Sequence, residues 1–418
     1  MKSRRYIYLI LTVGLLLPQL SCNQAGEKEA IMPDVNLSHL NHLYDDVQLP
    51  GNIAAGIVHI YSEYPDYIYE IEPNEGYTCV DDVARAMMID KIRFSDNTEI
   101  RDQYNRMARF LLYMQANNGW FHNFVWHDLS INKTWRTSLA EPNWWSWRAF
   151  WALSNYSGGD SPLADSIRKA CNRLAGNVFE TYLDHPKITD TIEGVVVPAW
   201  MPLGTAGDQA GLLIMGLEAY YQHIKRDDRA LKMIEKLADG ILLTQKGDEN
   251  TFPYGAFMSW QNLWHAYGNL QSYAMLKAGE LLKRDDYTES ALREINGFYA
   301  WLIRENYYAN FTLSKQGDDF TVTEKNRFPQ IAYGFRPMIW ACMTAADNTG
   351  EEKYSDFAFR IATWFLGNNA AGQQMYDPAT GRCFDGIVSE TKVNKNSGAE
   401  STVEALLALQ VFEKYSKP

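Results

Sequence analysis

Two acidic motifs near opposite ends of the chain carry the residues best suited to chemistry. Asp81 and Asp82 stand in the stretch EGYTCVDDVAR, residues 75–85, and Glu400 stands in SGAEST, residues 397–402. Each motif places carboxyl groups where a glycine-bearing loop enters a predicted helix. Helix N-termini carry unpaired N–H groups and a positive dipole end, which favour carboxylates. A pair of carboxyl groups can serve as general acid and general base in glycoside hydrolysis.

The two motifs suggest catalytic roles. Adjacent helical residues point about 100° apart, so one of Asp81 and Asp82 can face a cleft while the other caps the helix. We assign the base to Asp81 or Asp82, and the acid to Glu400 opposite it across a closed ring of helices. Arg85, within one turn, could keep one carboxylate ionised. A capping box between Ser397 and Glu400 is the competing interpretation of the second motif.

Further polar and aromatic residues lie near the starts of successive predicted helices, and we expect them to bind substrate. Tryptophan faces can stack on sugar rings, although tryptophans also fill ordinary cores. The predicted binding residues are Arg85, Trp126, Glu141, Trp145, Asp208, Trp264, His265, Arg336 and Asp385. For the carboxylates among them, a helix cap or a plain turn is the competing explanation.

Tryptophans are densest between residues 144 and 151. Trp144, Trp147 and Trp151 follow the spacing i, i+3 and i+7 and are predicted to be buried, whereas Trp145 points elsewhere and is the better sugar platform. Trp264 and His265 would share one helical stripe with Trp260, and such a stripe is more often core than binding surface.

Composition excludes several functional classes. The net charge of −12 argues against nucleic acid as a partner. The sequence contains no nucleophile-elbow, P-loop or dinucleotide-binding motif. Cysteines and histidines follow no metal-binding spacing, so we expect no metal and no cofactor. We expect mostly buried free thiols at four positions, Cys79, Cys171, Cys342 and Cys383.

The first residues indicate export. Basic residues at positions 2–5 precede an apolar run at 6–17, which is typical of a secretory signal. Cys22 follows a small residue, as in a bacterial lipobox, so we predict a signal peptide at 1–21, lipidation of Cys22 and anchoring in the bacterial envelope. Simple secretion is the alternative. We expect a tether and lead-in segment at 22–50 and a single monomeric domain at 51–418.

Most of the chain after residue 80 has apolar residues every three to four positions, as in helices. The predicted helices are 82–94, 99–116, 144–154, 163–183, 207–224, 228–244, 259–282, 287–306, 330–347, 353–366 and 398–415. Residues 118–137 interrupt the pattern and predict a hairpin or extended loop. Repeated helical hairpins form a solenoid or a closed toroid. We favour closure, because the unusual polar residues precede the first helix of successive hairpins and would meet at one rim.

Four stretches together carry a resemblance to a known family. Residues 75–85, Glu141 with 148–153, 364–385 and 396–407 resemble a bacterial (α/α) toroid module of the six-hairpin glycosidase-like proteins, which occurs alone or fused to glycosyltransferases. The resemblance implies an all-α, (α/α)6-type toroid with few short strands in its loops. The sequence departs from the module at Pro142, where another acid is usual, and at 333–337, which replaces a Gln-rich turn. Both changes would alter the cleft.

The sequence therefore predicts a protein that binds carbohydrate. We expect a glycoside hydrolase acting on an oligosaccharide or polysaccharide at the cell envelope, inverting with two carboxyl groups roughly 6.5–9.5 Å apart. One alternative is a non-catalytic glycan-binding lipoprotein with the same aromatic residues. Another is a polysaccharide lyase that uses Tyr254, His265 and Arg336, although the acidic net charge weighs against this reaction.

Overall fold

The computed structural model describes residues 31–414. The chain from Met32 onward forms one compact unit. The predicted signal peptide and Cys22 lie outside the described residues. The predicted boundary at residue 51 falls in the turn between strands β1 (Tyr44–Leu49) and β2 (Ile53–Val58), which pair antiparallel.

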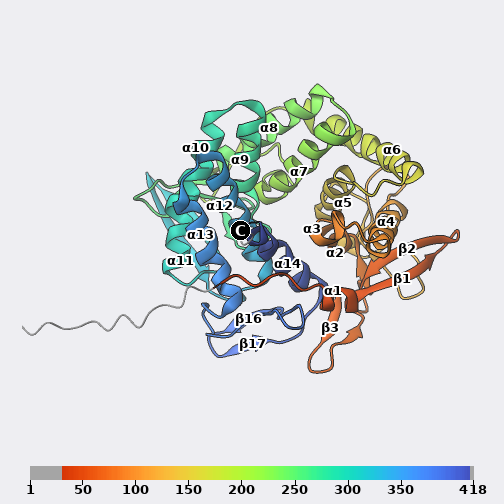
Figure 1. The fold of residues 1–418 in the computed structure, drawn as a ribbon. Helices are drawn as coiled ribbons and strands as arrows, with labels where there is room; N and C mark the ends of the chain where they lie inside the picture. Colours follow the sequence, from red (N-terminus) through yellow and green to blue (C-terminus); the bar gives the residue numbers. More distant parts are fainter. Residues whose placement is uncertain (1–30, 415–418) are drawn as a thin grey trace, which may run out of the picture. The chain divides into compact units, whose positions relative to one another are not determined.

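An inner ring of six helices organises the described part of the chain (Figure 1). These helices are α2 (Val80–Ala86), α5 (Trp144–Ser154), α7 (Gly207–Ala219), α9 (Gln271–Leu282), α12 (Arg336–Thr349) and α14 (Ala399–Glu413). Each packs on the next in chain order, and α14 packs on α2, which closes the ring. The inner helices are apolar on most sides, as expected for helices surrounded by others.

An outer layer of helices covers this ring. Its members are α4 (Thr98–Tyr113), α6 (Ser161–Val178), α8 (Asp228–Thr244), α10 (Asp285–Glu294), α11 (Ala300–Arg304) and α13 (Glu352–Ala362), with the short α1 (Ser38–Leu43) against α14. These helices are amphipathic: α8 buries Met233, Leu237 and Ile241 at helical spacing and leaves its other face to solvent. The (α/α)6-type toroid predicted from the sequence is confirmed.

Helix starts follow local capping chemistry. The Asn143 side chain accepts a hydrogen bond from the N–H of Trp144 and begins α5, and Asp227 accepts one from the N–H of Arg229 and begins α8. Both helices have the bounds predicted from the sequence. The predicted helix 82–94 instead ends at Ala86, and residues 90–93 form a separate turn, α3 (Asp90–Arg93).

Short turns in 3₁₀ or π geometry extend or connect several helices. They are η1 (Arg136–Ser138), η2 (Phe179–Leu183), η3 (Tyr220–Ile224), η4 (Ile295–Tyr299), η5 (Ala332–Gly334) and η6 (Thr363–Leu366).

Strands occupy the loops. The largest sheet joins β11 (Leu263–His265), β12 (Asn310–Gln316) and β13 (Asp319–Asn326). The remaining strands pair as hairpins or across loops: β3 (Tyr61–Glu63) with β4 (Ile68–Glu70), β5 (Thr78–Cys79) with β6 (Phe124–Val125), β7 (Thr189–Ile192) with β8 (Val195–Pro198), β9 (Gln245–Lys246) with β10 (Ala256–Phe257), β14 (Tyr376–Asp377) with β15 (Arg382–Cys383), and β16 (Gly386–Ser389) with β17 (Lys392–Asn394).

The predicted helix 259–282 is wrong in its first half. Trp264 and His265 lie on strand β11, so they do not share a helical stripe with Trp260. The Trp264 ring stacks on Phe311 of the neighbouring strand at a centroid distance of 5.2 Å. Gly268 then turns the chain with a φ of +69°, where an added Cβ would lie 2.8 Å from the Tyr333 hydroxyl oxygen. Helix α9 begins only after this turn.

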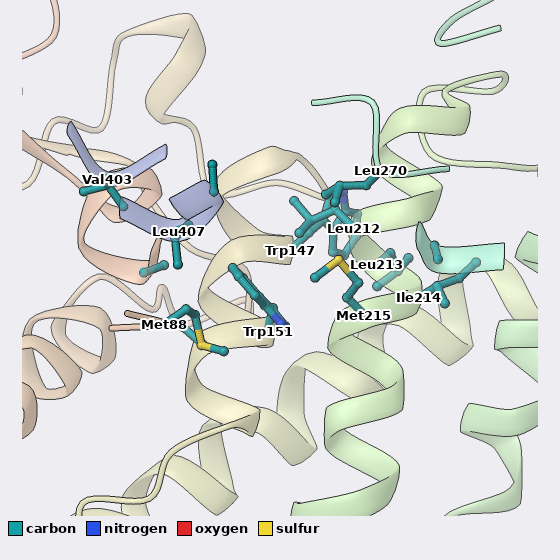
Figure 2. Close-up of a cluster of buried hydrophobic side chains, with 14 of the residues drawn as sticks. Met88, Trp147, Trp151, Leu212, Leu213, Ile214, Met215, Leu270, Val403 and Leu407 are labelled. Atoms are coloured by element: carbon teal, nitrogen blue, oxygen red, sulfur yellow. The ribbon is translucent and has the colours of Figure 1, made fainter. Parts of the chain in front are cut away.

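Side chains of neighbouring inner helices interlock to form the core. Figure 2 shows Trp147 and Trp151 of α5 in a buried cluster that also contains Met215 of α7 and Val403 and Leu407 of α14. The four cysteines of the described part are buried free thiols, as predicted. No helix among residues 31–414 has the length and apolar character needed to cross a bilayer.

Candidate functional site

A cavity of about 570 Å³ lies at the N-terminal ends of the inner helices. Its lining comes from the starts of α2, α5 and α14, from the loop before α9, and from η5 before α12. We call it the central pocket. A second cavity, of about 350 Å³, is lined by the C-terminal parts of the same ring of helices. The central pocket is the better candidate site, because it holds the two acidic motifs and faces the positive ends of the helix dipoles.

The central pocket gathers half of the residues predicted to act in catalysis or binding. Six of them line it: Asp81, Asp82, Arg85, Trp145, Asp385 and Glu400. Six others do not: Trp126, Glu141, Asp208, Trp264, His265 and Arg336. The first and last inner helices are neighbours in the closed ring, so Asp81 and Glu400 stand on adjacent helices. The expectation that they face each other across the ring is therefore wrong.

Arg85 connects the two acidic motifs. Its Nη2 donates to Asp82 Oδ1 at 2.5 Å and to Glu400 Oε2 at 3.3 Å, and its Nη1 donates to Glu404 Oε1 at 2.8 Å. The guanidinium group is buried, with 2 % of the side chain exposed. One cation therefore holds carboxyl groups from α2 and α14 together beneath the central pocket.

Asp82 is a buried member of this cluster. Besides Arg85, its carboxylate accepts a hydrogen bond from the Cys79 thiol, with 3.2 Å between Sγ and Oδ2. Burial raises the pKa of the Asp82 carboxyl, and Arg85 opposes that shift. Because 3 % of this side chain is exposed, Asp82 is placed to orient Arg85 and less well placed to meet a ligand.

Asp81 presents more of its surface to the central pocket, with 21 % of its side chain exposed. Arg148 Nε lies 3.1 Å from Asp81 Oδ1. Asn123 donates from Nδ2 to Asp81 Oδ2 at 3.0 Å and accepts from the backbone N–H of Asp81 through Oδ1 at 3.2 Å. Arg148 and Asn123 therefore hold the Asp81 side chain in a fixed orientation.

Glu400 is the most accessible carboxyl of the cluster, with 45 % of its side chain exposed. Desolvation by the surrounding protein raises the pKa of this carboxyl, Arg85 opposes the shift, and the nearby Asp82 adds to it. The capping box between Ser397 and Glu400, the competing interpretation of this motif, does not form. Gly398 is the N-cap residue of α14, and Asp385 Oδ1 accepts from its backbone N–H at 2.9 Å. The Glu400 side chain lies in the first turn of α14 but does not cap the helix.

Glu404 and Arg336 lie buried beneath the central pocket and form its floor. Glu404 accepts hydrogen bonds from Arg85 and from Nε and Nη2 of Arg336, and its side chain is fully buried. Burial alone would raise the pKa of Glu404, but the two guanidinium groups outweigh it and hold the pKa below its usual range. Arg336 supports the pocket from behind and does not line it.

Asp208 and His265 form a separate buried pair. His265 Nε2 lies 3.0 Å from Asp208 Oδ2, and Nδ1 lies 2.8 Å from the Tyr267 carbonyl oxygen. Both ring nitrogens therefore lie beside an oxygen atom. The His265 ring also stacks on the Tyr267 ring with centroids 3.9 Å apart. Tyr267 lines the central pocket, so this pair supports its wall.

Trp144 and Trp145 both line the central pocket, but their burial is the reverse of the expected pattern. Trp145 is 3 % exposed and donates from Nε1 to the Leu139 carbonyl oxygen at 2.9 Å. Trp144 is only half-buried, because α5 begins at this residue and the end of the helix lies at the rim. Trp144 is therefore the more accessible aromatic surface of the two.

Two other expected binding residues lie elsewhere. Trp126 is half-buried in the loop after β6, and Glu141 accepts a hydrogen bond from Asn143 Nδ2 at 3.0 Å near the start of α5. Sequence reasoning also missed residues of the pocket and its floor: Tyr61, Glu75, Asn123, Arg148, Tyr267, Tyr333 and Glu404. Glu404 had a usable signal, since it follows Glu400 by one helical turn. Tyr61 and Asn123 lie outside the predicted helices and had no such signal.

Comparisons with known proteins support the fold. No protein-family model matches the chain, and no curated protein matches its sequence. Among solved structures, a sugar epimerase from a ruminal bacterium aligns with a TM-score of 0.64 and 11 % identity over 93 % of this chain and 98 % of that one. Cellobiose 2-epimerase from Bacillus thermoamylovorans aligns with a TM-score of 0.62 and 11 % identity over 91 % and 96 %. The cellulase Cel9M of C. cellulolyticum aligns at 0.50 and 11 % over 88 % and 89 %.

The chain has the six-hairpin glycosidase-like fold. At this level of identity the likeness shows the arrangement of helices, and the chemistry has to be argued from the residues of the central pocket. Among residues 31–414 no group of three or more histidine, cysteine, aspartate or glutamate side chains is arranged to hold a metal ion.

Proposed function

We propose that the protein is a carbohydrate-processing enzyme, and that its reaction is glycoside hydrolysis with Glu400 as general acid and Asp81 as general base. The observation that carries the proposal is the contrast between these two carboxyl groups in one pocket. Asp81 is fixed beside Arg148, whereas Glu400 is accessible and its pKa is raised by desolvation. A carboxylate held in a fixed orientation and an accessible carboxyl with a raised pKa in the same pocket suit the roles of general base and general acid in glycosidic cleavage.

The charge balance of the cluster supports a protonated Glu400. Three guanidinium groups meet four carboxyl groups there: Arg85, Arg148 and Arg336 with Asp81, Asp82, Glu400 and Glu404. Glu404 is held by two arginines, and Asp82 lies 2.5 Å from Arg85. Glu400 has the longest contact, 3.3 Å to an Nη2 that Asp82 already occupies. A proton on Glu400 neutralises the excess negative charge at the lowest cost.

The mechanism follows from these positions. Glu400 donates its proton to the glycosidic oxygen as the bond to the anomeric carbon breaks, and the leaving sugar departs as an alcohol. Asp81 removes a proton from the attacking water, which completes the new bond at the anomeric carbon. Asp82 and Arg85 position Glu400, and the aromatic side chains of Trp144 and Tyr333 border the pocket where the sugar rings would lie.

The pocket disfavours the lyase alternative. A lyase must remove a proton from carbon, usually with a tyrosine or histidine base. Tyr254, His265 and Arg336 do not line the central pocket. Tyr61 and Tyr333 do line it, but burial raises the pKa of both phenols above the usual value, although arginines oppose this for Tyr333. A raised pKa leaves little phenolate at neutral pH.

Turnover of purified protein on a glycan panel tests the proposal. We expect the wild type to release reducing ends from at least one glycan, and Asp81→Asn and Glu400→Gln each to lose about 100-fold or more of that rate. Glu99→Gln is the matched control, because Glu99 also lies in the first turn of a helix but is exposed outside the pocket. Unchanged turnover in both pocket variants would remove the assignment.

Export and lipid anchoring at Cys22 remain part of the proposal on the strength of the N-terminal sequence alone. Labelling with a radioactive fatty acid in cells tests this point, and incorporation by the wild type but not by Cys22→Ala is the expected result. Equal labelling of both proteins would exclude the anchor.

A further inference from the structure

A second hollow adjoins the central pocket. It has a volume of about 450 Å³, and we call it the outer groove. It is lined by Tyr64, Val388, Lys392, Val393, Asn394, Lys395 and Asn396. Val388 and Asn394 line the central pocket as well. The two hollows therefore adjoin each other at the β16–β17 hairpin.

Two chain segments run continuously from the central pocket into the outer groove. On one side, Tyr61 lines the pocket and Tyr64 lines the groove. Three extended residues span about 10 Å, which is longer than one sugar ring. On the other side, the segment from 394 to 400 makes the same passage. Backbone hydrogen bonds join the two segments, from Ser397 N to Ser62 O at 3.0 Å and from Ala399 N to Ile60 O at 2.9 Å.

The outer groove offers an aromatic surface to solvent. Tyr64 is 51 % exposed, and the neighbouring Val388 is 44 % exposed. The backbone N–H of Tyr64 donates to Asn396 Oδ1 at 3.0 Å, which ties Tyr64 to the neighbouring segment. Lys395 Nζ lies 5.6 Å from the centre of the Tyr64 ring, and Lys392 is exposed beside it. An accessible ring bordered by ammonium donors is suited to sugars, which present apolar C–H faces and hydroxyl acceptors.

We propose that the outer groove binds further units of an oligosaccharide whose reacting unit lies in the central pocket, with Tyr64 stacking on a sugar at least one unit away from the cleaved bond. This inference rests on the proposed function and specifies its substrate class: a chain of three or more sugar units, in preference to a disaccharide. The two hollows share Val388 and Asn394, so sugar units that extend from the central pocket past these residues would lie in the outer groove.

The test measures how binding depends on chain length. Oligosaccharides of two to six units from cello-, xylo-, manno- and galacturono-series are titrated by calorimetry into the Glu400→Gln protein, alone and combined with Tyr64→Ala. We expect affinity to rise between two and four units, and Tyr64→Ala to weaken binding of four units about 3- to 10-fold while leaving two units unchanged. Tyr64→Phe keeps the aromatic ring and should keep the increase in affinity between two and four units. Trp260→Ala is the matched control, because Trp260 is 40 % exposed and lies outside the groove.

The results separate the two proposals. If Tyr64→Ala weakens binding equally for every chain length, or does not weaken binding at all, the proposed role of the outer groove is overturned, even when the wild type hydrolyses a glycan. Retained turnover in Glu400→Gln would overturn the catalytic assignment but leave a chain-length effect of Tyr64 intact. Absence of binding to every oligosaccharide in the panel would count against both.

Discussion

At the scale of single residues, one charged cluster bears on both the stability of the fold and the proposed chemistry. Its members are Arg85, Asp82, Glu400 and Glu404. Glu404 pairs with two buried guanidinium groups, and Arg85 also contacts Asp82 and Glu400. Each charge is acceptable in this buried site only because its partner is present. Glu400, the proposed acid, has the longest of the three contacts with Arg85, and this weaker contact suits a group that gains and loses a proton.

Removal of the Glu404 charge should destabilise the fold. Glu404→Gln leaves Arg85 and Arg336 without a shared carboxylate in the interior, and we expect a loss of about 3–5 kcal/mol in the free energy of unfolding. Urea denaturation followed by circular dichroism measures it, with Glu99→Gln as the control that should match the wild type. A Glu404→Gln protein within about 1 kcal/mol of the wild type would show that the network contributes little to stability.

At the scale of secondary-structure elements, buried polar side chains join helices and strands, and the spacing of apolar residues in the sequence does not predict these contacts. Glu294 of α10 is fully buried, accepts from the backbone N–H of Phe257 in β10 at 2.8 Å, and accepts from the hydroxyl of Ser272 in α9 at 2.6 Å. Burial raises the pKa of this carboxyl to about 7. Glu294 thereby joins an inner helix, an outer helix and a short strand through one side chain.

This carboxyl predicts a pH dependence of stability. The pKa of Glu294 is raised on folding, so its stabilising contribution is present below its ordinary pKa of 4.5 and is lost as the pH rises through about 7. The shift corresponds to about 3 kcal/mol. Glu294→Gln can accept from the N–H of Phe257 through Oε1 and donate to the Ser272 hydroxyl through Nε2. We expect this variant to lose less stability than the wild type between pH 4.5 and 8. Urea midpoints across that range test this, and parallel pH profiles would contradict it.

The sequence predicted whole helices well where apolar spacing and a cap agreed, as for α5 after Asn143 and α8 after Asp227. The predicted secondary structure was wrong where a segment pairs with a strand that is distant in the sequence. Trp264 lies on a strand because β12, far along the chain, supplies its hydrogen-bond partner and a ring to stack on. The same limit applies to the site: Asn123 meets Asp81 because β6 pairs with β5 from a distant part of the chain.

At the scale of the whole molecule, ring closure assembles the candidate site. The packing of α14 on α2 places residues from both ends of the described chain around Arg85. Helix α14 also buries apolar side chains along most of its length, including Val403, Leu406 and Leu407. The candidate site is therefore complete only when α14 packs on α2 and closes the ring.

Truncation tests this dependence. A chain that ends at Ser397 lacks α14, leaves the inner faces of α2 and α12 uncovered, and should unfold without a single sharp transition. A chain that ends at Lys414 keeps α14 and should unfold like the wild type. Thermal unfolding followed by circular dichroism and by tryptophan fluorescence compares the three proteins. A cooperative transition at the wild-type midpoint in the shorter protein would show that the ring does not need its last helix.

The most direct test of the central claim, that Glu400 supplies the proton and Asp81 activates the water, varies the leaving group. Two substrates of the sugar that the wild type hydrolyses are compared, one with a poor alkyl leaving group and one with dinitrophenol, which departs without a proton. We predict that Glu400→Gln loses about 100-fold or more in kcat/KM on the first and less than about 10-fold on the second, while Asp81→Asn loses a similar factor on both. An equal loss on both substrates in Glu400→Gln would contradict its role as the acid.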